Sequence, residues 1–194
     1  MPQLRSLPAQ PVMRDIYRAY PATCKPLGEF TEAVMRGPSP FAQGQRELIA
    51  AYVSGLNACT YCHGTHLAVA AACGVAPEVI KALLADIETA PIAAKMKPIL
   101  SYARKLTLSP ARMTAADAAS VYDAGWDDDA LYSTVLVTAV QFLQSLVDGV
   151  GLTLPEGYET EAGKRLSTQG YDVFAQVAKP GPIAAASPNA SNDG

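Results

Sequence analysis

Apolar residues recur at helical spacing along most of this chain, and this pattern constrains its fold more than any other feature. Between residues 43 and 56 they fall on one face of a helix, at Leu48, Ile49, Tyr52, Val53 and Leu56. A second helical pattern covers residues 60–73, where Gly74 can supply a left-handed cap and Pro77 can open the next helix. No segment alternates apolar and polar residues as a strand would. The sequence therefore predicts an all-α fold.

The length of the chain is that of one domain. With 194 residues, 49% of them hydrophobic, it can bury a full core. We expect a single helical domain over residues 25–179, between an N-terminal arm at 1–24 and a disordered tail at 180–194. Besides the two helices above, patterns and breakers predict helices at residues 13–20, 28–35, 77–84, 92–106, 115–123, 128–150 and 159–177.

The longest apolar stretch covers residues 131–154. Its second half is interrupted by polar side chains, which are expensive in lipid, at Gln141, Gln144, Ser145 and Asp148. We expect a helix that is buried inside the fold or at a contact between subunits of a homo-oligomer.

Charge and the N-terminal sequence exclude some function classes. The net charge is −3 and the basic residues are scattered, so the sequence does not predict nucleic-acid binding. The first residues lack the apolar core of a secretory signal, which predicts a cytoplasmic protein. Thiols stay reduced in the cytoplasm, so a close pair of cysteines there is typical of catalysis or metal binding.

Residues 59–66 hold both histidines of the chain and two of its four cysteines. If Thr60 caps the following helix, Cys62 falls in the first turn, where the helix dipole lowers the thiol pKa and favours a nucleophile. Cys59 then lies just outside the helix and can close a disulfide with Cys62. His66 lies one turn beyond Cys62 and can exchange its proton.

Glu47 is the best candidate to orient or deprotonate that histidine. On its predicted helix it is followed by a stripe of small residues that lets another helix approach closely, at Ala50, Ala51 and Ser54. We expect this packing to place Glu47 in a low-dielectric setting that raises its pKa toward that of a useful base.

The other residues of this type have weaker claims. His63 follows Cys62 directly and so points about 100 degrees away from it around the helix, which makes it peripheral. Cys73 lies at the far end of the same helix, where core packing is favoured. Cys24 has no visible partner.

Three alternatives to thiol catalysis remain open at this point. Residues 59–63 satisfy the Cys-x-x-Cys-His pattern of c-type haem attachment. A zinc site could use Cys59, Cys62 and His66, with Glu47 or water as the fourth ligand. In a non-enzymatic redox sensor or interaction protein, a disulfide would change a helical interface without turnover.

The same residues also carry a resemblance to a known family. A glutamate, a later Cys-x-x-Cys pair and a histidine four residues after the second cysteine resemble the signature of the AhpD-like alkylhydroperoxidase group in the carboxymuconolactone decarboxylase family. Glu47, Cys59, Cys62 and His66 fill its positions. The flanking segments 36–40, 46–50, 54–58 and 102–106 resemble the branch called peroxidase-related enzymes, and the resemblance covers roughly residues 25–158.

This resemblance implies an AhpD-like helical bundle that assembles as trimers or hexamers. It also implies a thiol-dependent peroxidase in which Glu47 and His66 relay a proton from Cys62, whose thiolate attacks the peroxide and becomes a sulfenic acid. Cys59 would then resolve that acid to a disulfide. No cofactor would be bound, and an external dithiol, typically a lipoyl group on a partner protein, would reduce the disulfide.

The chain differs from the family pattern at two places. Some family peroxidases have a histidine just before the second cysteine, where this chain has Tyr61, so we take the phenol as a possible accessory group. The late helix of the peroxidase-related branch tends to carry asparagines and an arginine, where this chain has Gln141, Gln144 and Ser145. Decarboxylation of a carboxymuconolactone is not implied, because the enzymes with that activity do not rely on a cysteine pair.

Overall fold

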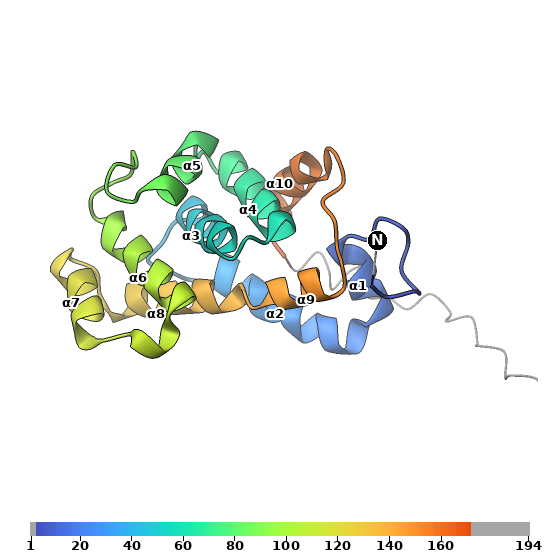
Figure 1. The fold of residues 1–194 in the computed structure, drawn as a ribbon, viewed down its shortest axis with the longest axis horizontal. Helices are drawn as coiled ribbons and strands as arrows, with labels where there is room; N and C mark the ends of the chain where they lie inside the picture. The colour runs from blue at the N-terminus through green and yellow to red at the C-terminus, as the bar shows by residue number, and fades with distance from the viewer. Residues whose placement is uncertain (1–2, 172–194) are drawn as a thin grey trace, which may run out of the picture.

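The computed structural model of this chain describes residues 3–171, and every regular element within them is a helix (Figure 1). The prediction of a single-domain, all-α fold is confirmed. The predicted tail at 180–194 lies outside the described residues, as does the end of the helix predicted at 159–177. The elements are α1 (Met13–Ala19), α2 (Pro21–Arg36), α3 (Gln43–Leu56), α4 (Thr60–Ala72), α5 (Pro77–Ala85), α6 (Met96–Leu108), the 3₁₀ turn η1 (Pro110–Arg112), α7 (Ala115–Asp123), α8 (Asp128–Val140), α9 (Leu143–Gly149) and α10 (Tyr158–Gln169).

Helix α3 is the centre of the fold. All of its residues from 46 to 54 are buried, and it packs most closely against α4 (Figure 1). The predicted stripe of small side chains makes this possible, since Ala50, Ala51 and Ser54 are completely covered. On its other side α4 contacts α10, where a Cβ on Gly163 would lie 2.8 Å from the carbonyl oxygen of Ala68. The absence of a side chain at Gly163 therefore sets how closely α10 covers α4.

The N-terminal residues are more helical than the sequence predicts. The helix predicted at 28–35 begins at Pro21 instead, where proline occupies the first position that tolerates it, and continues through Pro26. Together α1 and α2 bury Ile16, Tyr17 and Met35 in the core. This burial offsets the backbone hydrogen bond that Pro26 cannot form.

The prediction of a single helix at 128–150 is wrong, because the helix is interrupted at Gln141 and Phe142, between α8 and α9. The Gln141 side chain is buried and accepts a hydrogen bond from Ser54 Oγ at 2.9 Å, which turns this residue toward α3. Among the described residues, the segment Asp128–Gly149 is long and apolar enough to cross a bilayer by length and composition, a test that a core helix also passes.

Candidate active site

Cys59, rather than Thr60, is the N-cap of α4. Its sulfur accepts a hydrogen bond from the backbone N–H of Cys62 at 3.4 Å, the position that a capping oxygen usually fills. The preceding Ala58 has a φ of +57°, in the left-handed region, and this turn places the Cys59 sulfur over the first turn of α4. The prediction that Thr60 caps this helix was therefore wrong.

The pKa values of the two thiols shift in opposite directions. Hydrogen bonds from the thiol and the backbone N–H of Cys62 lower the pKa of Cys59, despite its burial and the nearby charge of Asp148. The hydrogen bond to Cys59, burial and the negative charge of Cys59 raise the pKa of Cys62. The predicted low pKa of Cys62 was therefore wrong, since the hydrogen bond between the two thiols favours the thiolate at Cys59.

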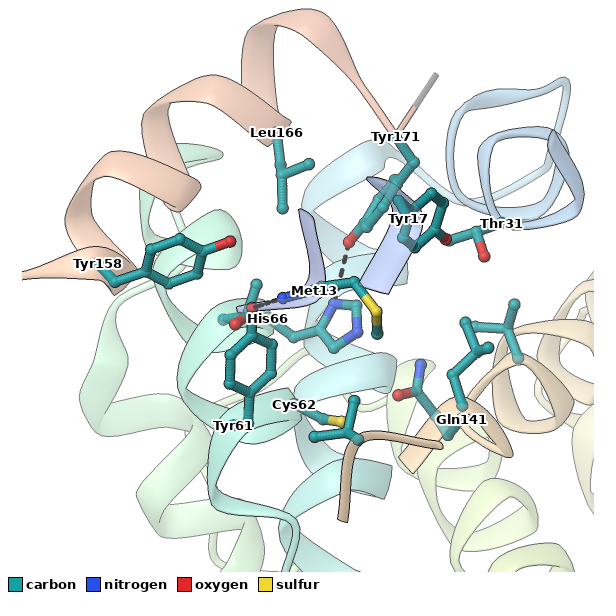
Figure 2. A pocket seen from close by; sticks show the side chains of 14 residues that line it. Met13, Tyr17, Thr31, Tyr61, Cys62, His66, Gln141, Tyr158, Leu166 and Tyr171 are labelled. Carbon is teal, nitrogen blue, oxygen red and sulfur yellow. Dashed lines mark hydrogen bonds between the residues drawn. The ribbon is translucent and has the colours of Figure 1, made fainter. Parts of the chain in front are cut away.

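The two cysteines also differ in their access to a small cavity beside α4. Its volume is about 70 Å³, several times the roughly 10–15 Å³ that one water molecule needs. Cys62 lines this cavity (Figure 2), whereas Cys59 does not and instead contacts Asp148, with its sulfur 3.5 Å from Oδ1. The other lining residues are Met13, Tyr17, Thr31, Tyr61, Thr65, His66, Val140, Gln141, Leu143, Val147, Tyr158, Leu166 and Tyr171.

Glu47 and His66 form a buried pair between α3 and α4. His66 Nδ1 lies 2.8 Å from Glu47 Oε2, and the glutamate side chain is wholly buried. Burial alone would raise the pKa of Glu47, but the hydrogen bond and charge of His66 and the charge of Arg36 hold it below its usual value. The predicted rise in this pKa was therefore wrong. Because the ionised carboxylate accepts the Nδ1 proton, the second ring nitrogen of His66 is left to face the cavity (Figure 2).

Two further residues hold Glu47, and neither was predicted as a site residue. Arg36 Nη2 lies 2.6 Å from Glu47 Oε1. The Tyr171 hydroxyl lies 3.3 Å from both carboxylate oxygens and 3.2 Å from His66 Nδ1 (Figure 2). Burial and the charge of Glu47 raise the pKa of Tyr171 well above its usual value, so its phenol stays a neutral donor.

The end of α2 is fixed so that Arg36 reaches the site. Arg46 on α3 donates from Nη1 to the carbonyl oxygens of Val34, at 3.1 Å, and Gly37, at 2.8 Å. Arg36 stood in one of the segments that carry the family resemblance, which was its only signal. Nothing in the local sequence pointed to Tyr171.

Tyr61 forms part of the cavity wall. Its hydroxyl accepts the backbone N–H of Met13 at 3.0 Å, and its ring packs against Tyr158 with centroids 5.9 Å apart. Burial and the nearby Tyr158 raise the pKa of Tyr61, so the phenol is neutral. His63 bonds the carbonyl of Ala51 through Nδ1 at 2.8 Å and does not line the cavity, which agrees with its predicted peripheral place.

The residues of the alternative metal and haem sites are arranged differently from a ligand set. Within residues 3–171, no three His, Cys, Asp or Glu side chains converge as metal ligands, so the proposed zinc ligands do not form a site. In the Cys-x-x-Cys-His pattern of haem attachment, Cys59 is only 1% exposed and Cys62 only 9%. Its histidine, His63, is hydrogen-bonded to the carbonyl of Ala51. Cys24 is buried in the core and Cys73 is the C-cap of α4, both away from the cavity lining.

Comparisons with known proteins show a family match over part of the chain and a shared fold. Residues 21–105, which include Arg36, Glu47 and the 59–66 segment, match the sequence profile of the carboxymuconolactone decarboxylase family. An uncharacterized peroxidase-related protein from Silicibacter sp. TM1040 has a similar fold, with a TM-score of 0.68, 23% identity, and coverage of 75% of this chain and 78% of that one. The AhpD core of an uncharacterized peroxidase-related protein from Ralstonia eutropha JMP134 also has a similar fold, with a TM-score of 0.70 and 19% identity. The match covers 77% of this chain and 79% of that one. No curated protein matches the sequence. Residues 21–105 are therefore similar to the carboxymuconolactone decarboxylase family, and the fold of the chain is similar to that of these two peroxidase-related proteins.

Proposed function

We propose that this protein is a thiol-dependent, AhpD-like peroxidase that reduces a small peroxide at Cys62. One observation carries the proposal: the buried Glu47–His66 pair lies beside the cavity that Cys62 lines, with a ring nitrogen of His66 free to take a proton. Cys59 lies behind Cys62, outside that cavity. Access to the peroxide therefore assigns the attack to Cys62, although the pKa values favour a resting thiolate at Cys59.

In the first step, Cys62 passes its proton to His66 as its sulfur attacks one peroxide oxygen. The S–O bond forms, the O–O bond breaks, and the sulfur is oxidised to a sulfenic acid while the peroxide is reduced. The leaving oxygen takes the proton from the imidazolium and departs as an alcohol or water. Glu47 holds the imidazole in orientation and stabilises its positive charge, as the carboxylate of a catalytic triad does.

In the second step, the Cys59 thiolate attacks the sulfur of the Cys62 sulfenic acid. The S–S bond forms, the S–O bond breaks, and the leaving hydroxide is protonated to water. The N-cap position and lowered pKa of Cys59 suit this resolving role better than the first attack. An external dithiol, such as a lipoyl group on a partner protein, then reduces the disulfide by thiol exchange.

The protein would act in the cytoplasm, where such a reductant keeps the pair cycling. We place a contact between subunits of a homo-oligomer, a trimer or hexamer, on α8 and α9. Tyr132 is 63% exposed there and Phe142 is 53% exposed, which leaves large apolar side chains uncovered on a single chain. Light scattering coupled to gel filtration measures the subunit number.

Steady-state reduction of hydrogen peroxide and tert-butyl hydroperoxide by dihydrolipoamide tests the proposal. Cys62→Ser should abolish turnover. Cys59→Ser should react with one peroxide and stop at the sulfenic acid, which dimedone traps as an adduct at Cys62. Cys73→Ser, outside the site, keeps native activity. Full activity in Cys62→Ser would remove the assigned nucleophile. If no peroxide is turned over but an added oxidant closes the Cys59–Cys62 disulfide, the redox-sensor alternative replaces the enzyme.

A further inference from the structure

The hydroxyl of Thr65 is buried at the cavity and has no hydrogen-bond partner among residues 3–171. Other helical threonines donate to the carbonyl four residues earlier, as Thr31, Thr107 and Thr134 do at 2.7, 2.7 and 2.8 Å. For Thr65 that acceptor would be Tyr61, and the bond is not made. An unpartnered buried donor is costly, so this hydroxyl marks a place where the cavity can bind an oxygen atom.

The position of Thr65 ties this hydroxyl to the reacting sulfur. It lies three residues after Cys62 and directly before His66 on α4, and all three line the same cavity. Side chains three residues apart are neighbours on a helix surface. The thiol, the imidazole and the free hydroxyl therefore face one small volume.

The rest of the cavity wall is mainly apolar. Its side chains come from several distant elements and include Tyr17, Val140, Leu143, Val147 and Leu166. A ligand that matches this lining is small and uncharged, with oxygen at the end near α4 and an apolar group away from it.

We propose that Thr65 donates a hydrogen bond to the leaving oxygen of a peroxide at Cys62, an inference that rests on the proposed function. As Cys62 attacks one oxygen and the O–O bond breaks, negative charge grows on the other oxygen. The Thr65 hydroxyl stabilises that charge and keeps its own proton, while the proton that completes the alcohol comes from His66. This hydrogen bond is strongest in the transition state, so it acts on the rate of sulfenic acid formation.

Single-turnover oxidation of Cys62 by tert-butyl hydroperoxide, with Thr65→Val and Thr65→Ser, tests the proposal. The valine has nearly the same shape but no hydroxyl, so we expect the second-order rate constant to fall about tenfold and serine to restore most of it. Thr65→Val also removes an unsatisfied buried donor, so its Tm should equal or exceed that of the native protein. Thr134→Val is the matched control. It loses a bond that is made in the protein, so its Tm should fall while the rate stays native.

Two results would overturn the assignment. An unchanged rate in Thr65→Val means that the hydroxyl meets only water. A rate loss that is accompanied by a lower Tm, and that serine does not restore, means that the threonine is structural.

A second arm separates this inference from the proposed function. The Cys62→Ser protein cannot react, and tert-butanol, the alcohol that reduction would release, should raise its Tm more than that of the Cys62→Ser, Thr65→Val protein. If native protein consumes no peroxide, the proposed function fails, and equal Tm shifts with the alcohol then overturn the oxygen-binding role as well. A larger shift with threonine retains that role.

Discussion

The helix pair α3–α4 and the C-terminal segment that covers it contribute to the site in different ways. The pair supplies the reacting groups within one short stretch of sequence, Glu47 on α3 and the 59–66 segment on α4. The covering segment, from α9 through α10 to Tyr171, supplies cavity walls and hydrogen bonds from far along the chain. The chemistry of the site is therefore local, while the shape and polarity of its cavity depend on long-range packing.

Substitutions in these two regions should therefore affect function in different ways. A substitution in the pair removes a reacting group, whereas one in the cover changes access, orientation or pKa. Substitutions in the helix pair should therefore abolish or strongly slow the reaction, whereas substitutions in the covering segment should change its rate or pH dependence. The following predictions test that difference.

Glu47→Gln should have the largest effect. Removing the buried carboxylate leaves Arg36 without its 2.6 Å partner, which should lower the free energy of unfolding by about 3 kcal/mol. Peroxide turnover should fall about 100-fold, because the imidazolium of His66 loses its anion. Urea denaturation and steady-state kinetics measure the two effects. The control is Glu29→Gln, an exposed residue at 3.7 Å from Lys25, whose loss should matter little.

The same variant should alter the pH dependence of stability. The pKa of Glu47 is lower in the folded protein than in the unfolded chain, so its ionisation stabilises the fold above the unfolded pKa. That contribution is lost as the pH falls through the folded pKa. The acid-induced drop in unfolding free energy should therefore be shallower in Glu47→Gln. An equally steep drop would contradict the lowered pKa.

Gly163→Ala, a substitution in α10 of the covering segment, should have an intermediate effect on stability and on access to the cavity. Its new Cβ would lie 2.8 Å from the backbone oxygen of Ala68, so α10 must move away from α4, at a cost of about 1–3 kcal/mol. Thermal denaturation and the alkylation rate of Cys62 measure the lost stability and the opened cavity. Gly149→Ala, whose Cβ would meet nothing within 4 Å, should change neither. A native alkylation rate in Gly163→Ala would show that α10 does not limit access.

Asp148→Asn should have the smallest effect on turnover, less than about threefold, because the carboxylate is exposed and its hydrogen bond is with the resolving thiol rather than with Cys62. Its charge raises the pKa of Cys59, so the substitution should lower that pKa. The alkylation rate of Cys59 against pH, followed by peptide mass spectrometry in a Cys62→Ser background, should shift to lower pH. Glu156→Gln, an exposed acid nearby in sequence, should leave the profile in place. A shift to higher pH in Asp148→Asn would reverse the assigned electrostatics.

The helix pair was predictable because its signals are local. The apolar spacing of α3 and its end at residue 56, the small-residue stripe after Glu47, and the left-handed cap at Gly74 all agree with the structure. The spacing between Cys62 and His66 predicted a common helix face, and both line one cavity.

The electrostatics of the site could not be predicted in the same way. The choice of Cys59 over Thr60 as N-cap depends on the left-handed turn at Ala58, which a non-glycine residue seldom adopts. The direction of the Glu47 pKa shift depends on His66, which meets Glu47 where α3 packs against α4, and on Arg36, which reaches the site through the packing of α2 against α3.

The cavity was even less accessible from sequence. At the break after Val140, Gln141 accepts a hydrogen bond from Ser54, a residue 87 positions away. Tyr171 meets Glu47 across 124 positions, and no periodicity or motif predicts such a contact.

The Tyr171 contact also has a consequence for synthesis of the protein. During translation, α3 and α4 leave the ribosome long before Tyr171 does, since 105 positions separate it even from His66. A nascent chain can thus form its thiol pair while the Glu47–His66 pair still lacks its third partner and the cavity lacks its cover. The cavity wall gains Tyr171 last, so a chain released before this residue would carry a Glu47–His66 pair without its phenol partner and a Cys62 thiol beside an incomplete cavity.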